Sequence, residues 1–531
     1  MKISIKNFRS LINTSQIEIK PITLLLGRNS SGKSSFIRTF PMLKQSVEEK
    51  SKSPILLYGN YVDFGSYNDI KPKVNPTSDD SNYELGIFPG NDFENFLTRF
   101  RNYYKTEMPD FAEIIKDFEV KLKFCENHKK LIVVERLIAK IYGKTIEILI
   151  NKQDNTISSI KINNLNILSN ESAVNIKMFA NYVGGIIPEF YIVHSKDADY
   201  GSDPSIFFFK RIEQILKKIG VYKSESTMNS FFRFANKHFS ANDEIFLQKL
   251  KATTSIKGMK SIVKTWDLDT LEFRLLRFLH FLHFFFEDLI FRFNQYCSVI
   301  FTNVKYLAPV RATAERYYRI QHLSINDVDP NGKNLPMFLD SLSEASFKNF
   351  QNWTFENFNF KTKIDKIEGH YSIKIVYSDS FEVNLSDTGF GYSQILPVLT
   401  QMWYSGNNFN NNKDYFRYYQ IMHTPRIIAI EQPELHLHPE FQAKFADSLC
   451  KILEFANEND VKLKLIIETH SEVIVNRIGH LILNEKLSKD DVNLVIFNKL
   501  QEEGASDISF ANYTEDGLIN NWPQGFFTPG I

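Results

Sequence analysis

The chain has 531 residues, of which 43% are hydrophobic and 24% charged, values that are ordinary for a soluble globular protein. Lys and Arg (63) balance Asp and Glu (62), so the net charge of +1 argues neither for nor against nucleic-acid binding. Cys125, Cys297 and Cys450 lack metal or disulfide spacing, which suits a reducing cytoplasm. No signal peptide opens the sequence, and charges interrupt the apolar segment 271–293, so we expect no membrane span.

A glycine-bounded loop near the N-terminus is the first segment with assignable chemistry. The apolar run Ile22–Leu26 predicts a short buried strand, and the sequence GRNSSGKS follows it directly. Its two glycines let the backbone curl so that N–H groups point at phosphate oxygens, and the next helix adds a favourable field. Lys33 would reach the β- and γ-phosphates and the Ser34 hydroxyl would bind Mg²⁺. The predicted ATP-binding residues are Gly27, Asn29, Ser30, Ser31, Gly32, Lys33, Ser34 and Ser35.

The region between the chain ends predicts three kinds of structure. Residues 50–90 are rich in Gly, Asn, Asp, Ser and Pro, which indicates loops with short strands and no assignable chemistry. Residues 115–165 alternate apolar and polar side chains, which predicts a β-meander of about four strands. From about 200 to 300 the apolar period becomes helical, with a long helix near 271–293 and many phenylalanines that we expect to pack between helices.

The last third alternates strands and helices, which indicates a parallel α/β sheet. A hairpin is predicted at 365–385, strands at 426–430, 464–467 and 493–497, and helices after Pro439 and Ser471. The expected fold class is therefore α/β, with a nucleotide-binding head formed from both chain ends. We expect residues 1–90 and 301–531 to form this head, and residues 91–300 to form an insertion with the β-meander lobe and the helical part.

Polar residues after the strand 426–430 supply the carboxylate that a phosphate loop needs to hold Mg²⁺. Glu431 and Gln432 emerge where ligands bind in open α/β sheets, so Ser34 and Glu431 are the predicted Mg²⁺ ligands. Hydrolysis also needs a group that deprotonates or positions the attacking water. Gln432 and Glu434 are the candidates. The alternative for Glu434 is a cap on the next helix or a surface ion pair.

A second apolar strand, at 465–467, ends in Glu-Thr-His-Ser and places His470 at the same expected sheet edge. A histidine there can hydrogen-bond a γ-phosphate or the attacking water. His436 and His438 are spaced like a metal pair, but a metal site needs three or four ligands and no third lies nearby. We interpret these two as structural or interface residues.

The segment Leu385–Gln394 combines a strand end, two glycines and small hydroxyl residues before a helix, which predicts a second anion-binding helix N-terminus. A domain with a complete phosphate loop rarely needs another for the same nucleotide, so we expect this loop to serve a second copy of the chain. The alternative is a plain helix cap by Ser386 or Asp387. The residues predicted to act in trans are Ser386, Asp387, Gly389, Gly391, Ser393 and Gln394.

These four elements, in this order, resemble the ATP-binding-cassette class of ATPases, and within it the SMC-like branch that includes Rad50, RecF and OLD-family ATPases. By this resemblance GRNSSGKS is the Walker A loop, IIAIEQPE the Walker B strand, LSDTGFGYSQ the signature loop, and ETHSE carries the switch histidine. A closer resemblance, over roughly 1–75 and 300–531, is to bacterial AAA-type ATPases with EQPELHLHP, YLAPVRATAERYY (306–318) and WPQGFF (522–527). Several members of that group act in anti-phage defence, and Septu-type PtuA ATPases, some beside retrons, pair with an HNH nuclease.

The resemblance implies an ABC-type P-loop head that forms a head-to-tail homodimer or higher homo-oligomer, with ATP between the Walker A loop of one copy and the signature loop of the other. It also implies that Arg311 and Arg316 reach phosphate or a partner. The usual Asp–Glu pair of the Walker B strand is Glu431–Gln432 here, so an amide takes the catalytic carboxylate position. Either Glu434 takes the role of the catalytic carboxylate, or hydrolysis is slow and bound ATP mainly holds the dimer together as a clamp. No lid-loop glutamine is assigned.

We therefore expect a cytoplasmic ATPase that uses ATP and Mg²⁺, acts as a sensor or regulator in antiviral defence and holds a separate HNH-type nuclease. DNA or a retron nucleic acid is a further candidate partner. About 60 residues follow His470, too few for the Toprim nuclease domain of OLD-family proteins. Two alternatives stay open. One is a RecF- or Rad50-like repair ATPase that binds DNA through lysines of the insertion, with steep salt dependence. The other is a scaffold in which ATP only joins subunits.

Overall fold

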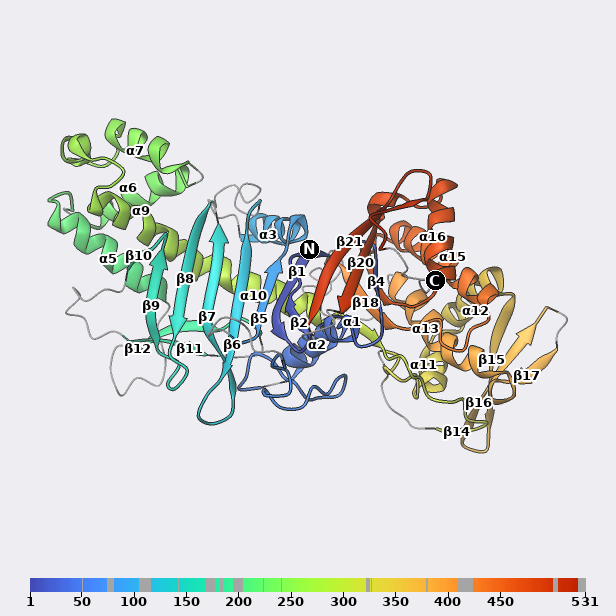
Figure 1. Ribbon diagram of the computed structural model, residues 1–531. Coiled ribbons are helices and arrows are strands. Elements are labelled where there is room, and N and C mark those ends of the chain that lie inside the picture. Colours follow the sequence, from blue (N-terminus) through green and yellow to red (C-terminus); the bar gives the residue numbers. More distant parts are fainter. Residues whose placement is uncertain are drawn as a thin grey trace. The chain divides into compact units, whose positions relative to one another are not determined.

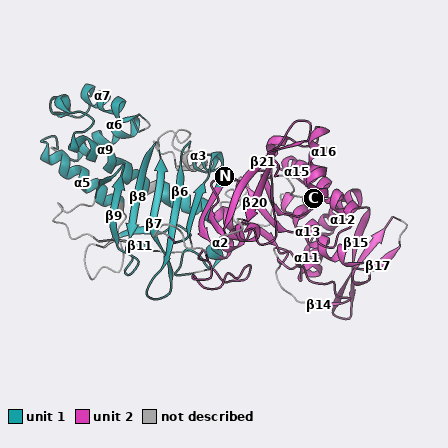
Figure 2. Cartoon of the chain, in the orientation of Figure 1, with its two compact units in different colours: residues 1–2, 46–56, 82–298 teal, residues 3–45, 57–81, 299–531 magenta. Residues whose placement is uncertain are grey.

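The structure, a computed structural model, divides into two compact units (Figure 2). Unit 1 comprises residues 1–2, 46–56 and 82–298, and unit 2 comprises residues 3–45, 57–81 and 299–531. The residues that the structure describes are 1–49, 51–73, 81–104, 116–141, 143–167, 177–181, 185–193, 204–222, 224–239, 241–320, 325, 327–378, 381–407, 424–499 and 505–523.

Unit 2 contains an α/β sheet assembled from both ends of the chain (Figure 1). Five parallel strands lie side by side in the order β20 (Val492–Lys499), β4 (Ile22–Gly27), β19 (Leu463–Glu468), β18 (Arg426–Glu431) and β13 (Lys305–Leu307). Beyond β20 the order continues through β21 (Ser506–Tyr513), β2 (Leu11–Asn13) and β1 (Lys2–Phe8), and the short strands β3 (Ile17–Glu18) and β22 (Ile519–Asn520) pair with β1 and β21. The α/β class and its origin in both chain ends are confirmed.

The register of the central strands brings the ends of three strands, two of them glutamates, to one edge. All six residues of β4 are buried, as expected for a parallel strand covered on both faces. Glu431, the last residue of β18, pairs with Glu468, the last residue of β19, and Glu468 pairs with Leu25 of β4. The loop that follows β4 therefore begins at the same edge as Glu431 and Glu468.

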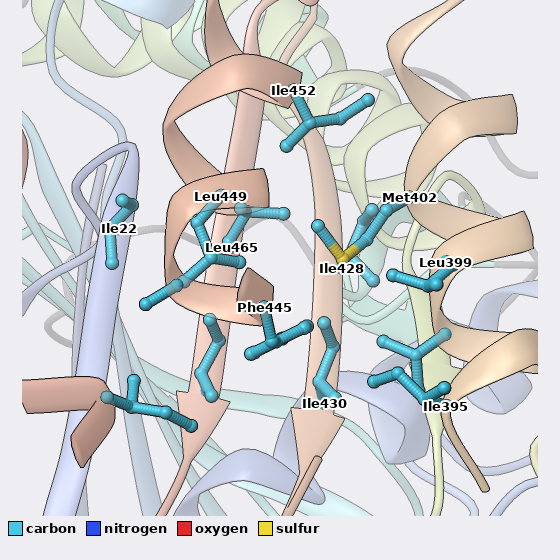
Figure 3. Close-up of a cluster of buried hydrophobic side chains, with 14 of the residues drawn as sticks. Ile22, Ile395, Leu399, Met402, Ile428, Ile430, Phe445, Leu449, Ile452 and Leu465 are labelled. Atoms are coloured by element: carbon cyan, nitrogen blue, oxygen red, sulfur yellow. The ribbon is translucent and has the colours of Figure 1, made fainter. Parts of the chain in front are cut away.

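Helices of unit 2 cover the sheet with apolar side chains. Figure 3 shows Ile428, Ile430 and Leu465 of the strands packed with Phe445 and Leu449 of one helix and with neighbouring side chains of another, Ile395, Leu399 and Met402. Burial of such a side chain contributes about 1.5–3 kcal/mol, which fixes the strand ends that carry the polar residues. The helices are α1 (Lys33–Ile37), α2 (Thr39–Glu48), α11 (Leu335–Ser341), α12 (Glu344–Phe358), α13 (Phe390–Gly406), α15 (Pro439–Glu458) and α16 (Glu472–Leu483).

A small antiparallel sheet in unit 2 precedes α13. It contains β14 (Tyr318–Arg319), β15 (Phe360–Ile367), β16 (His370–Tyr377) and β17 (Glu382–Asn384). The hairpin predicted at 365–385 is confirmed as β16 and β17. Strand β15 was not predicted, because its charged sequence FKTKIDKI lacks a regular apolar alternation and its last two residues are exposed. Two short 3₁₀ turns, η3 (Leu385–Asp387) and η4 (Lys489–Asp491), also belong to unit 2.

Unit 1 joins an antiparallel meander to helices. The meander strands run in the order β5 (Glu84–Phe88), β6 (Glu119–Glu126), β7 (Ile132–Ile141), β8 (Lys144–Ile150), β9 (Ile157–Ile162) and β10 (Leu165–Asn166), and β11 (Lys177–Asn181) pairs with β12 (Glu189–Val193). Its helices are α3 (Asn91–Tyr104), α5 (Pro204–Lys218), α6 (Glu225–Lys237), α7 (Asp243–Ala252), α8 (Met259–Ile262), α9 (Leu271–Phe284) and α10 (Ile290–Thr302), with η1 (Val263–Thr265) and the π-helix η2 (Phe285–Leu289). The four-strand meander and the long helical stretch after 271 are confirmed.

The charged residues of α9 are partly buried rather than membrane-facing. Arg277 is 1% exposed, and its guanidinium lies 4.4 Å from the ring centre of Phe246 and 4.5 Å from that of Phe281. Asp243 pairs with both Arg277 (3.4 Å) and Lys144 (2.6 Å). The phenylalanines of this region therefore pack between helices, as predicted. No helix among the described residues has the length and apolarity that a membrane span requires.

Candidate functional site

The loop between β4 and α1 has a backbone that only glycine permits at two positions. Gly27 has φ +150°, and a Cβ there would lie 2.4 Å from the Phe497 carbonyl oxygen. Gly32 has φ +93°, and its Cβ would lie 2.7 Å from a methyl carbon of Leu11. Because both positions exclude larger residues, the loop curls tightly before α1 begins at Lys33.

A cavity of about 810 Å³ opens at this loop. Seven of the eight predicted ATP-binding residues line it, from Asn29 to Ser35, together with Gln432 and Glu468. No sequence motif marks the other lining residues, which follow β1 or lie in the loop-rich segment: Arg9, Ser10, Asn68, Asp69, Lys71 and Lys73. Arg9, Lys71 and Lys73 are basic, and for these six residues that charge was the available sequence signal of an anion site.

Lys33 is buried beside the loop carbonyls. Its ammonium donates to the carbonyl oxygens of Gly27 (3.0 Å) and Arg28 (2.8 Å) and lies 4.0 Å from the Glu468 carboxylate. Burial lowers the pKa of Lys33, and the charges of Glu468 and Glu434 oppose that shift. A poorly hydrated cation held against a curled, N–H-rich loop is suited to accept phosphate oxygens.

The partner of Ser34 is Glu468, a residue that the sequence analysis did not select. The Ser34 hydroxyl lies 3.0 and 2.9 Å from the two Glu468 carboxylate oxygens. Burial and then the charge of Glu431 raise the pKa of Glu468 to about 7. Glu468 follows an apolar strand just as Glu431 does, so the same signal was present at both positions.

Glu431 is engaged on both carboxylate oxygens. Arg38 donates to them from Nε (2.7 Å) and Nη2 (2.8 Å), and the Tyr306 hydroxyl donates to Oε1 (2.7 Å). Arg311, which is 2% exposed, donates to the Glu431 backbone carbonyl (2.9 Å). Hydrogen bonds to Glu431 raise the pKa of Arg38, and burial raises the pKa of Tyr306, so both stay protonated donors. Ser34 and Glu431, the predicted Mg²⁺ pair, are thus each hydrogen-bonded to other side chains.

The other predicted catalytic residues lie around the ends of β18 and β19. Gln432 lines the cavity with φ +44°, and its N–H donates to the Glu468 carbonyl (2.8 Å). Glu434 accepts a hydrogen bond from the His470 backbone N–H (2.7 Å), and burial raises its pKa. Burial and then the charge of Lys33 lower the pKa of His470, which favours the neutral imidazole. The alternative that Glu434 caps the next helix is wrong, because His438 is the N-cap of α15. The ion-pair alternative stays a hypothesis.

The two spaced histidines have structural contacts. The Nδ1 of His438 accepts from the Glu440 N–H (3.3 Å), and the ring of His436 lies 5.9 Å from that of Phe390. Within the described parts of the chain, no group of three or more His, Cys, Asp or Glu side chains is arranged to hold a metal ion. The interpretation of this pair as structural residues is therefore supported by their contacts.

The predicted signature loop divides into an exposed and a buried part. Ser386, Asp387 and Gly389 are exposed, and Gly389 is the N-cap of α13, without a side-chain cap. The plain-cap alternative is therefore wrong, because neither hydroxyl nor carboxylate caps α13. Arg316 donates to Asp387 (2.5 Å), so of the two arginines only Arg316 contacts this exposed loop.

Ser393 and Gln394 instead lie inside the chain. They are 6% and 4% exposed, and Gln394 exchanges two hydrogen bonds of 3.1 Å with the Arg311 backbone. They follow the first turn of α13, which points their side chains toward the core. They therefore stabilise the loop from inside rather than form its exposed surface. Gly391 packs against the His436 carbonyl, 3.2 Å from where a Cβ would stand. None of the residues from 386 to 394 is among the described residues that line the cavity.

Comparison with known proteins identifies one family. The model of the AAA ATPase domain matches residues 1–475. No curated protein matches the chain. Of the predicted C-terminal WPQGFF segment, only Trp522 and Pro523 lie within the described residues.

Solved structures with a similar fold include SMC head domains. The Smc head domain of Pyrococcus furiosus, bound to the C-terminal domain of ScpA, has 11% identity and a TM-score of 0.34, with 96% of each chain covered. The SMC head domain from Thermotoga maritima has 9% identity and a TM-score of 0.31, with 96% of this chain and 97% of that chain covered. The recombination mediator RecF has 11% identity and a TM-score of 0.26, with 96% and 97% covered. These values are too low to transfer a function.

Proposed function

This chain belongs to the AAA ATPase domain family and is an ATP hydrolase, and we propose that two copies clamp ATP between them head to tail. ATP held by the loop 27–35 of one copy meets Ser386, Asp387 and Gly389 of the other. The observation that carries this proposal is the position of these three residues: they are exposed, and they are not among the described residues that line the cavity of their own chain.

The exposed end of α13 is suited to a phosphate from outside the chain. The helix runs for 17 residues from Phe390, and its N-cap, Gly389, contributes no side-chain hydrogen bond. The first N–H groups of an uncapped helix are free to bind an anion, and its dipole favours negative charge. Phe390, the first residue of the helix, is 61% exposed, so this helix end lies at the surface of the chain.

The cavity residues fit a triphosphate with Mg²⁺. The curled loop supplies backbone N–H groups, Lys33 supplies a cation, and Ser34 supplies a hydroxyl beside a carboxylate. Mg²⁺, when bound, would neutralise charge on the β- and γ-phosphates. Gln432 can orient a water molecule but its amide cannot accept a proton from it, so hydrolysis is expected to be slow and ATP to act mainly as a clamp.

We assign to this clamp a role as sensor or regulator of antiviral defence, with a separate HNH-type nuclease as effector. What supports the assignment is the resemblance of the Walker B and C-terminal motifs to those of defence ATPases. The test first looks for an HNH-type nuclease gene beside the gene for this chain, then co-expresses the two and challenges the cells with phage. A neighbourhood without a nuclease gene would count against the assignment. Wild-type protein should protect the cells and Lys33→Ala should not. Protection that survives in Lys33→Ala would reject an ATP-dependent role.

Direct DNA binding is the second candidate function, and charge in unit 1 favours it. Residues 204–266 contain 12 Lys and Arg but 4 Asp and Glu, a net of +8 in a chain whose total is +1. Many of these side chains are exposed on α5, α6 and the segment after α7, among them Lys210, Lys217, Lys237, Lys257, Lys260 and Lys264. Duplex DNA binding by the purified chain that weakens steeply with salt would favour this function over a nuclease regulator.

If two copies clamp ATP between them, a larger side chain at Gly389 should prevent dimerisation without unfolding the chain. A Cβ at Gly389 meets nothing within 4 Å, so Gly389→Gln should change the free energy of unfolding by about 1 kcal/mol or less. Sedimentation with a non-hydrolysable ATP analogue should show dimers for wild type and monomers for Gly389→Gln, with ATP still bound. Glu458→Gln, at an exposed position of α15, is the control and should dimerise. Dimers of Gly389→Gln would contradict the clamp.

A further inference from the structure

Two carboxylates end neighbouring strands at the edge of the nucleotide cavity, and their surroundings differ. The register of β18 and β19 places Glu431 and Glu468 side by side. Glu468 lines the cavity, whereas Glu431 is not among the described residues that do. Both carboxylates are buried, at 1% and 2% exposure, so neither reaches bulk water.

The hydrogen bonds of Glu431 occupy three of the about four lone-pair sites of its carboxylate. Arg38 binds both its oxygens in a two-pronged contact, and Tyr306 adds a third donor to Oε1. A planar guanidinium paired this way with a carboxylate is a strong and directional contact. A metal ion at Glu431 would have to displace or share with Arg38, which carries the same sign of charge.

Glu468, unlike Glu431, accepts its side-chain hydrogen bond from a residue of the phosphate loop. Its nearest side-chain donor is the Ser34 hydroxyl, at 3.0 and 2.9 Å from its two oxygens. A serine hydroxyl has one proton and two lone pairs, so a Ser34 that donates to Glu468 keeps its lone pairs available for a cation. An acceptor behind a metal ligand orients the ligand and raises its affinity for the metal.

The backbone holds Glu468 in this place. Its carbonyl accepts from the Gln432 N–H (2.8 Å), and the next residue, Thr469, donates its N–H to the Leu25 carbonyl (3.2 Å). Glu468 is thereby fixed between the strand that enters the phosphate loop and the strand that ends in Glu431. Its neighbour Gln432, at the cavity wall, is a neutral amide and adds no negative charge.

We propose that Glu468, together with Ser34, forms the Mg²⁺ site of this ATPase, and that Glu431 is a structural anion that anchors Arg38. The proposal deepens the proposed function, because it rests on ATP binding in the same cavity. Hard cations such as Mg²⁺ prefer oxygen ligands: the Ser34 hydroxyl supplies one, and the Glu468 carboxylate that accepts from it holds that hydroxyl in place.

The test measures metal affinity directly, with Mn²⁺ as the probe and a non-hydrolysable ATP analogue bound. Electron paramagnetic resonance reports free Mn²⁺. Glu468→Gln should weaken Mn²⁺ binding about 10- to 100-fold, Glu468→Asp should restore part of it, and Glu431→Gln should stay within about threefold of wild type. Thermal unfolding of each variant without nucleotide checks that it is folded.

Wild-type Mn²⁺ affinity in folded Glu468→Gln would overturn the inference, as would an equal or larger loss in Glu431→Gln. Nucleotide binding in excess chelator separates this from the proposed function. A wild-type chain that binds no ATP analogue at all would reject the ATP site itself. A wild type that binds the analogue, with Mn²⁺ affinity insensitive to Glu468, would reject only the assignment of the metal site.

Discussion

Lys33→Ala should lower kcat/KM for ATP hydrolysis by about 100-fold or more, the usual cost of removing a charge that stabilises a transferring phosphoryl group. The physical reason lies in the burial of this cation. Lys33 is 2% exposed, and its ammonium is held between the loop carbonyls of Gly27 and Arg28 and the Glu468 carboxylate. Among the described residues that line the cavity, the other basic side chains follow β1 or lie in the segment 68–73, so none replaces Lys33 at the loop.

The measurement for Lys33→Ala is steady-state phosphate release, with binding of a fluorescent ATP analogue measured in parallel. Lys249→Ala is the control, because Lys249 is an exposed lysine on α7 of unit 1. That control should retain wild-type activity. Undiminished phosphate release by Lys33→Ala would show that the cavity described above is not the site of hydrolysis.

Glu431→Ala should lower the free energy of unfolding of the nucleotide-free protein by about 1.5–3 kcal/mol, the range for hydrogen bonds to a charged group, because the Arg38 side chain left behind is 34% exposed and partly hydrated. Arg38 would lose both of its carboxylate contacts, and the Tyr306 hydroxyl would lose its acceptor. Burial lowers the pKa of Arg311 to about 10, so this neighbouring guanidinium would also remain charged with one fewer carboxylate nearby.

Urea unfolding without nucleotide or Mg²⁺ checks this expectation. Glu431→Gln keeps the shape and the acceptor oxygen, so its loss should be clearly smaller than that of Glu431→Ala. Arg316→Ala is the surface comparison, because its pair with Asp387 is exposed by 56% and 45% and should contribute about 1 kcal/mol or less. An unfolding free energy of Glu431→Ala equal to that of wild type would mean that Glu431 has no structural role.

The sequence predicted the parts of the site that depend on local pattern. The loop 27–34 was recognisable because its glycines, lysine and serine act through the backbone of one short segment. The strands that end at 431 and 468 were predicted from apolar runs, and the structure confirms both. Such elements are encoded within a few residues, and the parallel sheet follows from their alternation with helices.

Side-chain pairing between distant segments could not be predicted from the sequence. Arg38 and Glu431 are 393 positions apart, and Ser34 and Glu468 are 434 apart. Glu431 and Glu468 both follow apolar strands, so pattern alone could not say which of them faces the phosphate loop. The strand register and the reach of Arg38 decide it, and neither is visible in the sequence. The same holds for Asp69 and Lys71, which reach the cavity wall from a segment without motif.

The signature loop shows a further limit of pattern. The motif predicted one functional stretch from Ser386 to Gln394, but a helix begins within it and turns successive side chains in different directions. Gly389 therefore lies outside, while Gln394 bonds to the Arg311 backbone inside the chain. The helical period of 3.6 residues from Phe390 onward was the sequence signal that could have separated the exposed residues of this stretch from the buried ones.

The clamp is tested most directly by mixing two inactive variants. Lys33→Ala lacks a working phosphate loop and Gly389→Gln lacks a working signature loop, so each alone should hydrolyse almost no ATP. In an equimolar mixture, only mixed dimers carry an intact shared site, one of the two, so activity should recover to at most about half of wild type. If both variants are inactive alone and the mixture stays inactive, or if Gly389→Gln alone is fully active, the nucleotide site is not shared between two copies.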